Sequence, residues 1–237
     1  MFLLLCWVVA YLVIANEYVL PSPLQTLRSV GECFADPSFY VAFGNTVGRV
    51  FLSFALSFLL GLLLAFFARL YPFFRSFLHY VISVIRTVPT MAIILILLLW
   101  TTPLVAPVIV TVMILLPMCY QIILSALDEV DKTYLDVAKT FCVSRKRQIL
   151  QMYLPLAAPT VLSQTGGVFS MGLKVVISAE ILSFTFQSLG GMMQEAKIYL
   201  EMPRLFALTV ITVLFGFLAE ALFAAVCKLA TRWKDAI

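Results

Sequence analysis

Few residues of this chain have types and spacings that could do chemistry. The five cysteines are scattered and include no Cys-x-x-Cys pair, which argues against a disulfide framework and a metal site. The single histidine, His79, has no cysteine or carboxylate cluster near it in the sequence. No nucleophile–base pair, paired carboxylates or glycine-rich phosphate loop can be recognised. We therefore expect that the chain is not an enzyme and binds no metal or cofactor of its own.

Charged residues within hydrophobic stretches are the remaining chemical candidates. Arg49, Arg86, Lys174, Glu180 and Glu220 lie inside such stretches or near their ends. A charge at the centre of a bilayer costs about 2.5–3.5 kcal/mol on insertion scales. Each of these side chains should therefore face protein, water or a membrane interface.

Arg86 and Glu180 have the most informative surroundings. Proline at position 89, three residues after Arg86, predicts a broken turn whose carbonyl groups could line a pathway together with the guanidinium. Glu180 should pair with Lys174 or with a neighbouring span. Arg86, Pro89 and Glu180 are thus candidate pathway-lining residues, and purely structural contacts between helices remain the open alternative.

The composition indicates the class of protein that must position these residues. Hydrophobic residues make up 63% of the chain and charged residues 12%, and the mean hydropathy is +1.06. A soluble domain of 237 residues could not cover its surface with so few charges. We predict an all-α, polytopic protein of the lipid bilayer. The net charge of +4 needs no nucleic-acid partner, because the basic residues cluster beside the hydrophobic stretches.

The hydrophobic stretches predict six transmembrane helices in a single domain, residues 1–237. They cover about residues 1–20, 41–70, 78–100, 104–127, 156–184 and 205–227. The first stretch is short and lacks the basic start of a signal peptide, so we interpret it as a span. Shorter helices outside the spans are expected near residues 24–34 and 192–200.

The distribution of basic residues predicts the orientation. With six spans, both termini lie on one side of the membrane. That side collects Arg69, Arg75, Lys132, Lys139, Arg145, Lys146, Arg147, Lys228, Arg232 and Lys234, whereas the other side has Arg28, Lys197 and Arg204. Ten basic residues against three place both termini and the loop at residues 128–155 in the cytoplasm.

That loop contains an amphipathic pattern. Tyr134, Leu135, Ala138, Phe141 and Cys142 fall on one face of a predicted helix. Ser144 could cap a second short helix at residues 145–153, which would end before Pro155. Two short amphipathic helices between spans suit docking on a soluble partner. A solvated loop that only fixes the topology is the alternative.

The same loop resembles the EAA motif of permease subunits from bacterial binding-protein-dependent ABC importers. In that family a Glu-Ala-Ala sequence is followed by Gly at the seventh position and Leu-Pro at the nineteenth and twentieth. This chain has Asp136-Val-Ala138, then Cys142 in place of the glycine, and Leu154-Pro155 at the matching spacing. Three further segments resemble the nitrate, sulfonate, taurine and bicarbonate branch of these permeases: residues 20–23 (LPSP), 86–89 (RTVP) and 178–180 (SAE).

The resemblance, which covers nearly all of the chain, implies partners and a mechanism. Two permease copies, here a homodimer, would form a pathway in the bacterial inner membrane. An extracytoplasmic substrate-binding protein would deliver the solute, and a dimer of separate ATPase subunits would bind ATP and Mg²⁺. The implied ATPase-coupling residues are Tyr134, Leu135, Asp136, Ala138, Phe141, Cys142, Ser144, Arg145, Leu154 and Pro155.

Four functions remain open at this point. One is a membrane scaffold that transports nothing, which would tolerate loss of the coupling face without loss of uptake. Branch resemblance favours an importer for a small anion such as a sulfonate, nitrate, taurine or bicarbonate. Related permeases also carry vitamin precursors such as pyrimidines, so this substrate class is an alternative. A secondary transporter driven by an ion gradient is a further possibility, although it would often show acidic residues at mid-membrane.

Overall fold

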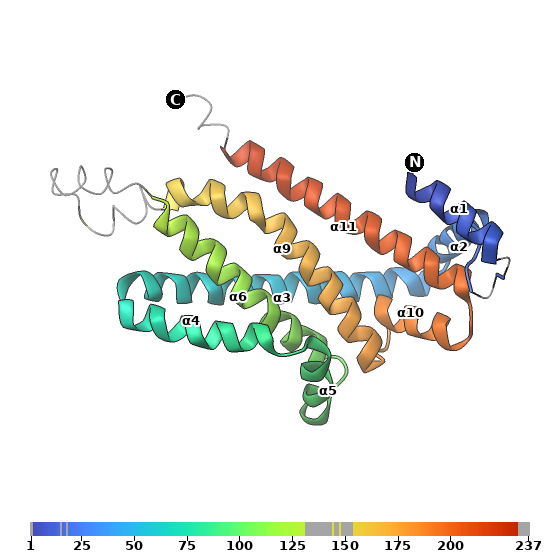
Figure 1. Cartoon of the computed structure of the whole chain (residues 1–237), viewed down its shortest axis with the longest axis horizontal. Coiled ribbons are helices and arrows are strands. Elements are labelled where there is room, and N and C mark those ends of the chain that lie inside the picture. The colour runs from blue at the N-terminus through green and yellow to red at the C-terminus, as the bar shows by residue number, and fades with distance from the viewer. Residues whose placement is uncertain are drawn as a thin grey trace. The chain divides into compact units, whose positions relative to one another are not determined.

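All the regular elements that the structure describes are α-helices. The computed structural model describes residues 2–14, 16, 17, 19–130, 144, 147 and 154–231. In chain order the helices are α1 (Phe2–Ile14), α2 (Pro23–Ala35), α3 (Pro37–Leu70), α4 (Pro72–Thr87), α5 (Thr90–Trp100), α6 (Ala106–Asp128), α9 (Leu154–Ser183), α10 (Leu189–Ile198) and α11 (Met202–Thr231), as labelled in Figure 1. The predicted all-α class is therefore confirmed.

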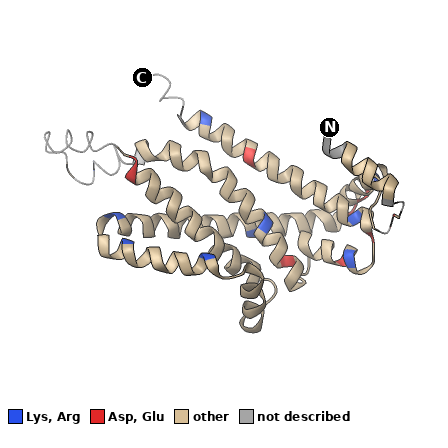
Figure 2. Cartoon of the chain, in the orientation of Figure 1, with Lys and Arg blue, Asp and Glu red and all other residues tan. Residues whose placement is uncertain are grey.

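Four of these helices are long and apolar enough to cross a membrane. They are α3, α6, α9 and α11, and the broken pair α4 and α5 gives a fifth candidate span if it is counted as one. Figure 2 shows how few charged residues these helices carry. Helix α1 has 13 residues, about 20 Å at a rise of about 1.5 Å per residue, which is short for a core of about 30 Å. The sixth span remains a prediction.

Local sequence explains where several helices begin and end. Ser22 caps α2, since its hydroxyl accepts a hydrogen bond from Gln25 N and the Gln25 side chain accepts one from Ser22 N. The break predicted at Pro89 is confirmed: α4 ends at Thr87, and Val88 is extended because a residue before proline avoids helical geometry. Ser188 caps α10, which begins three residues earlier than predicted.

The chain divides into two compact units. The first comprises Met1–Phe51, Met91–Val110 and Leu173–Phe217, and the second comprises Leu52–Thr90, Thr111–Gly172 and Leu218–Ile237. Helices α3, α6, α9 and α11 each contribute one part to each unit.

The first unit is built around α10 and the parts of α3, α9 and α11 that belong to it. Phe39, Val176, Leu189 and Leu208 are among its most deeply buried side chains. Aromatic contacts add to the packing, and the rings of Phe43 and Phe215 meet edge to face at 5.0 Å. The result is an apolar core that holds the short helix α10 against longer ones.

The second unit has an apolar cluster of its own, the second-unit core. Its buried members are Ala65, Ala68, Leu78, Ile82, Tyr120, Ile123, Leu124, Ala126, Val130, Ala157 and Val161. They come from α3, α4, α6 and the start of α9, and Val130 lies just after the end of α6. Gly61 permits the close approach of α3 to α6, because a Cβ atom there would lie 2.9 Å from Cys119 Cβ.

Candidate functional site

The predicted ATPase-coupling interval lies mostly outside the described residues. This holds for Tyr134, Leu135, Asp136, Ala138, Phe141, Cys142 and Arg145. Ser144 is described and exposed. Leu154 and Pro155 are the first two residues of α9, so the Leu-Pro pair of the motif stands where the span begins.

Both ends of the interval are anchored in the second-unit core. Val130, the last described residue before residues 131–143, is buried with 7% exposure. Ala157, in the first turn of α9, is buried in the same cluster with Val161. The chain therefore leaves the core at residue 130 and returns to it within α9, so the interval is tethered at both ends to one packed body.

Asp128 adds an electrostatic contact at this anchor. Its carboxylate accepts a hydrogen bond from Arg75 Nη2 at 2.7 Å and lies 3.7 Å from Arg69 Nε. These contacts join the end of α6 to the end of α3 and the start of α4. The sequence indicated both arginines only as topological charges, and their shared partner could not be predicted from spacing.

A cavity of about 410 Å³ opens beside this anchor in the second unit. It lies between α4 and α6 and is lined by Arg75, Ser76, His79, Tyr80, Ile82, Tyr120, Gln121, Leu124, Ser125 and Asp128. Arg86 Nη2 donates a hydrogen bond to Gln121 Oε1 at 2.6 Å, so one predicted pathway residue contacts the cavity lining. Arg86 and Pro89 are exposed in the described chain. The cavity presents N–H and O–H donors together with the Asp128 carboxylate, which already pairs with Arg75.

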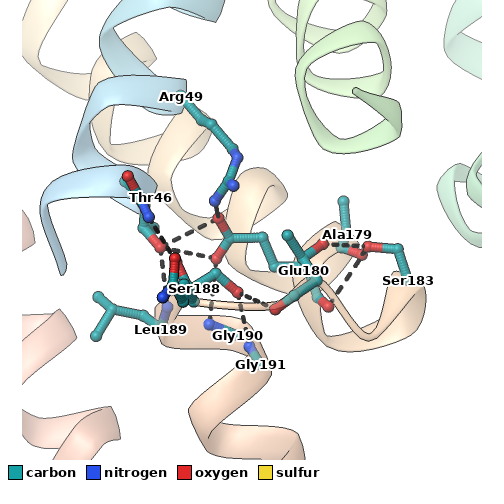
Figure 3. A network of polar contacts seen from close by, with 12 residues as sticks. Thr46, Arg49, Ala179, Glu180, Ser183, Ser188, Leu189, Gly190 and Gly191 are labelled. Atoms are coloured by element: carbon teal, nitrogen blue, oxygen red, sulfur yellow. Dashed lines mark hydrogen bonds and ion pairs between the residues drawn. The ribbon is translucent and has the colours of Figure 1, made fainter. Parts of the chain in front are cut away.

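Glu180 lies instead at the centre of a buried network in the first unit (Figure 3). Its carboxylate pairs with Arg49 Nη1 at 2.8 Å and accepts hydrogen bonds from Thr46 Oγ1 at 2.9 Å and Gly190 N at 3.1 Å. Thr46 Oγ1 in turn accepts a hydrogen bond from Leu189 N at 2.9 Å. Of the two alternatives for Glu180, the structure shows the pairing with a neighbouring span and not the one with Lys174.

The Gly-Gly sequence at the start of α10 makes this network possible. A Cβ atom on Gly190 would lie 2.8 Å from both Ile177 O and Ile181 N, and one on Gly191 would overlap the Thr185 carbonyl oxygen. Gly190 therefore lets the N-terminus of α10 approach α9, and Gly191 lets it approach the turn at Thr185. The partial positive charge of this N-terminus favours the Glu180 carboxylate. In the described chain Glu180 joins three helices and has no exposed surface.

Comparisons with known proteins agree with this architecture. The family described as binding-protein-dependent transport system inner membrane component matches residues 57–230. The taurine transport system permease protein TauC of Escherichia coli (strain K12) is 24% identical over 239 residues, which cover 98% of this chain and 86% of that protein.

Two solved structures share the fold. An amino acid ABC transporter solved with histidines has a TM-score of 0.65 and 20% identity, over 83% of this chain and 94% of its own. An inward-facing structure of the MetNI methionine ABC transporter has a TM-score of 0.67 and 14% identity, over 79% and 93% respectively. The family match covers well over half of the chain. The chain therefore belongs to the family of inner membrane components of binding-protein-dependent transport systems, as a non-catalytic permease subunit of an ABC importer.

Proposed function

We propose that two copies of this chain form the translocation pathway of an ATP-driven importer for a small anion of the sulfonate, nitrate, taurine or bicarbonate kind. An extracytoplasmic binding protein delivers the anion, and a dimer of separate ATPase chains binds ATP and Mg²⁺. The likeness to a taurine permease along 98% of this chain supports the substrate class.

The observation that carries the coupling part of this proposal is the anchoring of residues 131–153. This interval contains the EAA-like motif, and the residues on either side of it pack in the second-unit core. A displacement of the interval by the ATPase would reach α3, α4, α6 and α9 together, because well-packed interiors transmit strain. The apolar face formed by Tyr134, Leu135, Ala138 and Phe141 would bury against the ATPase cleft, with Asp136 at its rim.

The proposed orientation places this interval and both termini in the cytoplasm. It follows from the excess of basic residues on that side. One permease domain with six spans is the simplest architecture consistent with this orientation.

Co-purification with the ATPase encoded beside this chain tests the coupling. Wild type should retain the ATPase in detergent, whereas Asp136→Lys and Ala138→Trp should release it. Lys197→Glu is the matched control, because Lys197 is an exposed cation of the first unit and its replacement should not matter. Equal retention by all four chains would contradict the coupling assignment, and an ion-gradient mechanism would then be tested by uptake without ATP.

A binding titration tests the substrate class separately. The cognate binding protein should bind at least one of taurine, nitrate, bicarbonate or an alkanesulfonate, measured by calorimetry. Binding of a pyrimidine and of none of these anions would replace the anion by the vitamin-precursor alternative, while leaving the importer assignment intact.

A further inference from the structure

Lys174 is an exposed cation within a candidate membrane span. It lies in Pro155–Leu182, the apolar part of α9, eight residues from the nearer end of that span. It also precedes Glu180 by six residues, or about 9 Å along the helix. The two cations of α3 have partners: Arg49 pairs with Glu180, and Arg69 lies near Asp128. Among the described residues, no carboxylate is within ion-pair distance of Lys174.

The exposed side chains of α9 form one stripe that includes Lys174. Between Pro155 and Leu182 the exposed residues are Ser163, Gln164, Gly167, Met171, Lys174 and Ser178. At about 100° per residue these six positions fall within an arc of about 100°, so they share one side of the helix. We call them the polar face of α9. Apart from Met171, none carries a large apolar side chain.

A lipid-facing surface looks different in the same chain. Helix α11 exposes Val213, Leu214, Phe217, Leu218 and Leu222, all large and apolar, and one acid, Glu220, among them. Only 11% of its most apolar window is buried, compared with 67% of the corresponding window of α9. Thus α9 is the most enclosed candidate span, yet the little surface that it exposes is polar. Because a charged side chain in the hydrocarbon region is costly, this surface should face water rather than lipid.

We propose that the polar face of α9 lines the translocation pathway and that Lys174 is the residue that attracts the anion as it passes. This inference rests on the proposed function and adds the residue that selects charge. An unpaired cation in a narrow aqueous passage with low-dielectric walls raises the local concentration of anions and lowers that of cations. The occupant opposite Lys174 is therefore a small anion, such as a sulfonate, and not a carboxylate of the protein.

Charge-selective thiol labelling of the assembled importer tests this inference. The reporter is Ser178→Cys, one helical turn from Lys174, in a chain whose native cysteines are replaced by serine or alanine. The importer, with its ATPase, is reconstituted into proteoliposomes. The probes are two methanethiosulfonates, one carrying an ethanesulfonate group and the other a trimethylammonium group. We expect the sulfonate reagent to label the reporter, and Lys174→Gln to lower the sulfonate-to-ammonium rate ratio by roughly tenfold or more. Lys174→Arg should preserve the ratio.

Two controls make the outcome decisive. Leu214→Cys, on the apolar surface of α11, should react with neither reagent. The alternative is that Lys174 pairs with a carboxylate of the second permease copy. Glu220 of the partner subunit is the candidate, since Glu220 is an exposed acid of α11. The inference would be overturned if Lys174→Gln left the rate ratio unchanged. It would also be overturned if Lys174→Glu abolished assembly of the importer and the further change Glu220→Lys restored it. Absence of labelling at Ser178→Cys would do the same.

The same preparation separates this inference from the proposed function. ATPase retention and ATP hydrolysis are measured on every labelled sample. If the ATPase does not bind, the coupling proposal fails whatever the labelling shows. If it binds and the rate ratio does not depend on Lys174, the coupling proposal stands and the role of Lys174 is refuted.

Discussion

Arg49→Met should destabilise this protein much more than Glu180→Gln, although each change removes one half of the same ion pair. The Glu180 side chain has 0% of its surface exposed, whereas that of Arg49 has 13%. Without Arg49 the carboxylate stays buried, with only the Thr46 hydroxyl and Gly190 N–H to compensate its charge. Removing one partner of a buried ion pair costs about 3–5 kcal/mol.

Glu180→Gln should be milder for two reasons. The amide oxygen of glutamine can still accept the hydrogen bonds from Thr46 and Gly190, and Arg49 has an exposed edge through which it can reach water. We expect about 1–3 kcal/mol, the cost of losing a hydrogen bond to a charged group. The double variant should therefore resemble Glu180→Gln alone, since removing both charges leaves none unpaired.

Thermal unfolding in detergent, followed with a thiol-reactive fluorophore, measures these effects. Cys33 and Cys119 are buried and become reactive when the protein unfolds. At about 2–4 °C per kcal/mol for a chain of this size, Arg49→Met should lower the Tm by about 6–20 °C. Arg204→Met is the control, because its 32%-exposed side chain pairs with Glu201 on the surface, where an ion pair contributes about 0–1 kcal/mol.

The ranking of the variants is what decides the matter. If Arg49→Met lowered the Tm no more than Arg204→Met, the Glu180 carboxylate would not depend on Arg49. If Glu180→Gln were the more harmful change, the network would require a negative charge at position 180 for a reason other than compensation of Arg49. Either result would refute the reasoning above.

Three further outcomes are expected. Gly190→Ala should lower the Tm about as much as Glu180→Gln, because the added methyl group would lie 2.8 Å from Ile177 O and push α10 away from the carboxylate; an unchanged Tm would contradict this close approach. Asp128→Asn should reduce the fraction of ATPase retained on purification, and combining it with Arg75→Met should reduce it no further, whereas additive losses would mean that the two residues act separately. Burial raises the pKa of the Cys33 thiol above its ordinary 9.0, so stability from the protonated thiol is present below pH 9 and is lost as the pH rises through the folded-state pKa. Alkylation of Cys33 should therefore reach its half-maximal rate at a higher pH in the folded chain than in the unfolded chain, and identical pH profiles would contradict the shift.

Features encoded in short stretches of sequence could be predicted. Long apolar runs predicted α3, α6, α9 and α11. In a bilayer the backbone N–H and C=O groups need hydrogen-bond partners within the protein, and a helix supplies them within a single segment. The break at Pro89 follows from the missing N–H of one residue. Helices α2 and α10 were expected near their observed positions, and their first residues were set by capping at Ser22 and Ser188.

Contacts between distant segments could not be predicted. Arg49 and Glu180 are 131 residues apart, and their pairing depends on the relative register of α3 and α9. Helix geometry alone, however, disfavours the alternative in which Glu180 pairs with Lys174. Residues six apart on a helix point about 120° away from each other, so their side chains do not meet. The useful signal was the Gly-Gly sequence at residues 190–191, which marks a close approach of two backbones.

The anchoring of the coupling interval also depends on three-dimensional packing. The EAA-like spacing predicted where the interval lies, but not that Val130 and Ala157 share a cluster. That arrangement requires close contact of α3 with α6 at Gly61 and the fit of α4 beside them. Sequence periodicity shows which face of each helix is apolar, and it does not show which neighbour that face meets.

The spacing of the charged residues on helix α3 indicates the membrane thickness that the helix matches. Its 34 residues span about 51 Å, much more than the hydrocarbon core, but residues 50–68 between Arg49 and Arg69 contain no charge. Those nineteen residues extend about 28 Å, close to the roughly 30 Å of an ordinary bilayer. The two arginines then lie at opposite headgroup levels, and the Arg49–Glu180 network lies at one of them. Lipids with longer acyl chains would draw that network into hydrocarbon, so hydrophobic mismatch would act first on the contact that holds α10 in place.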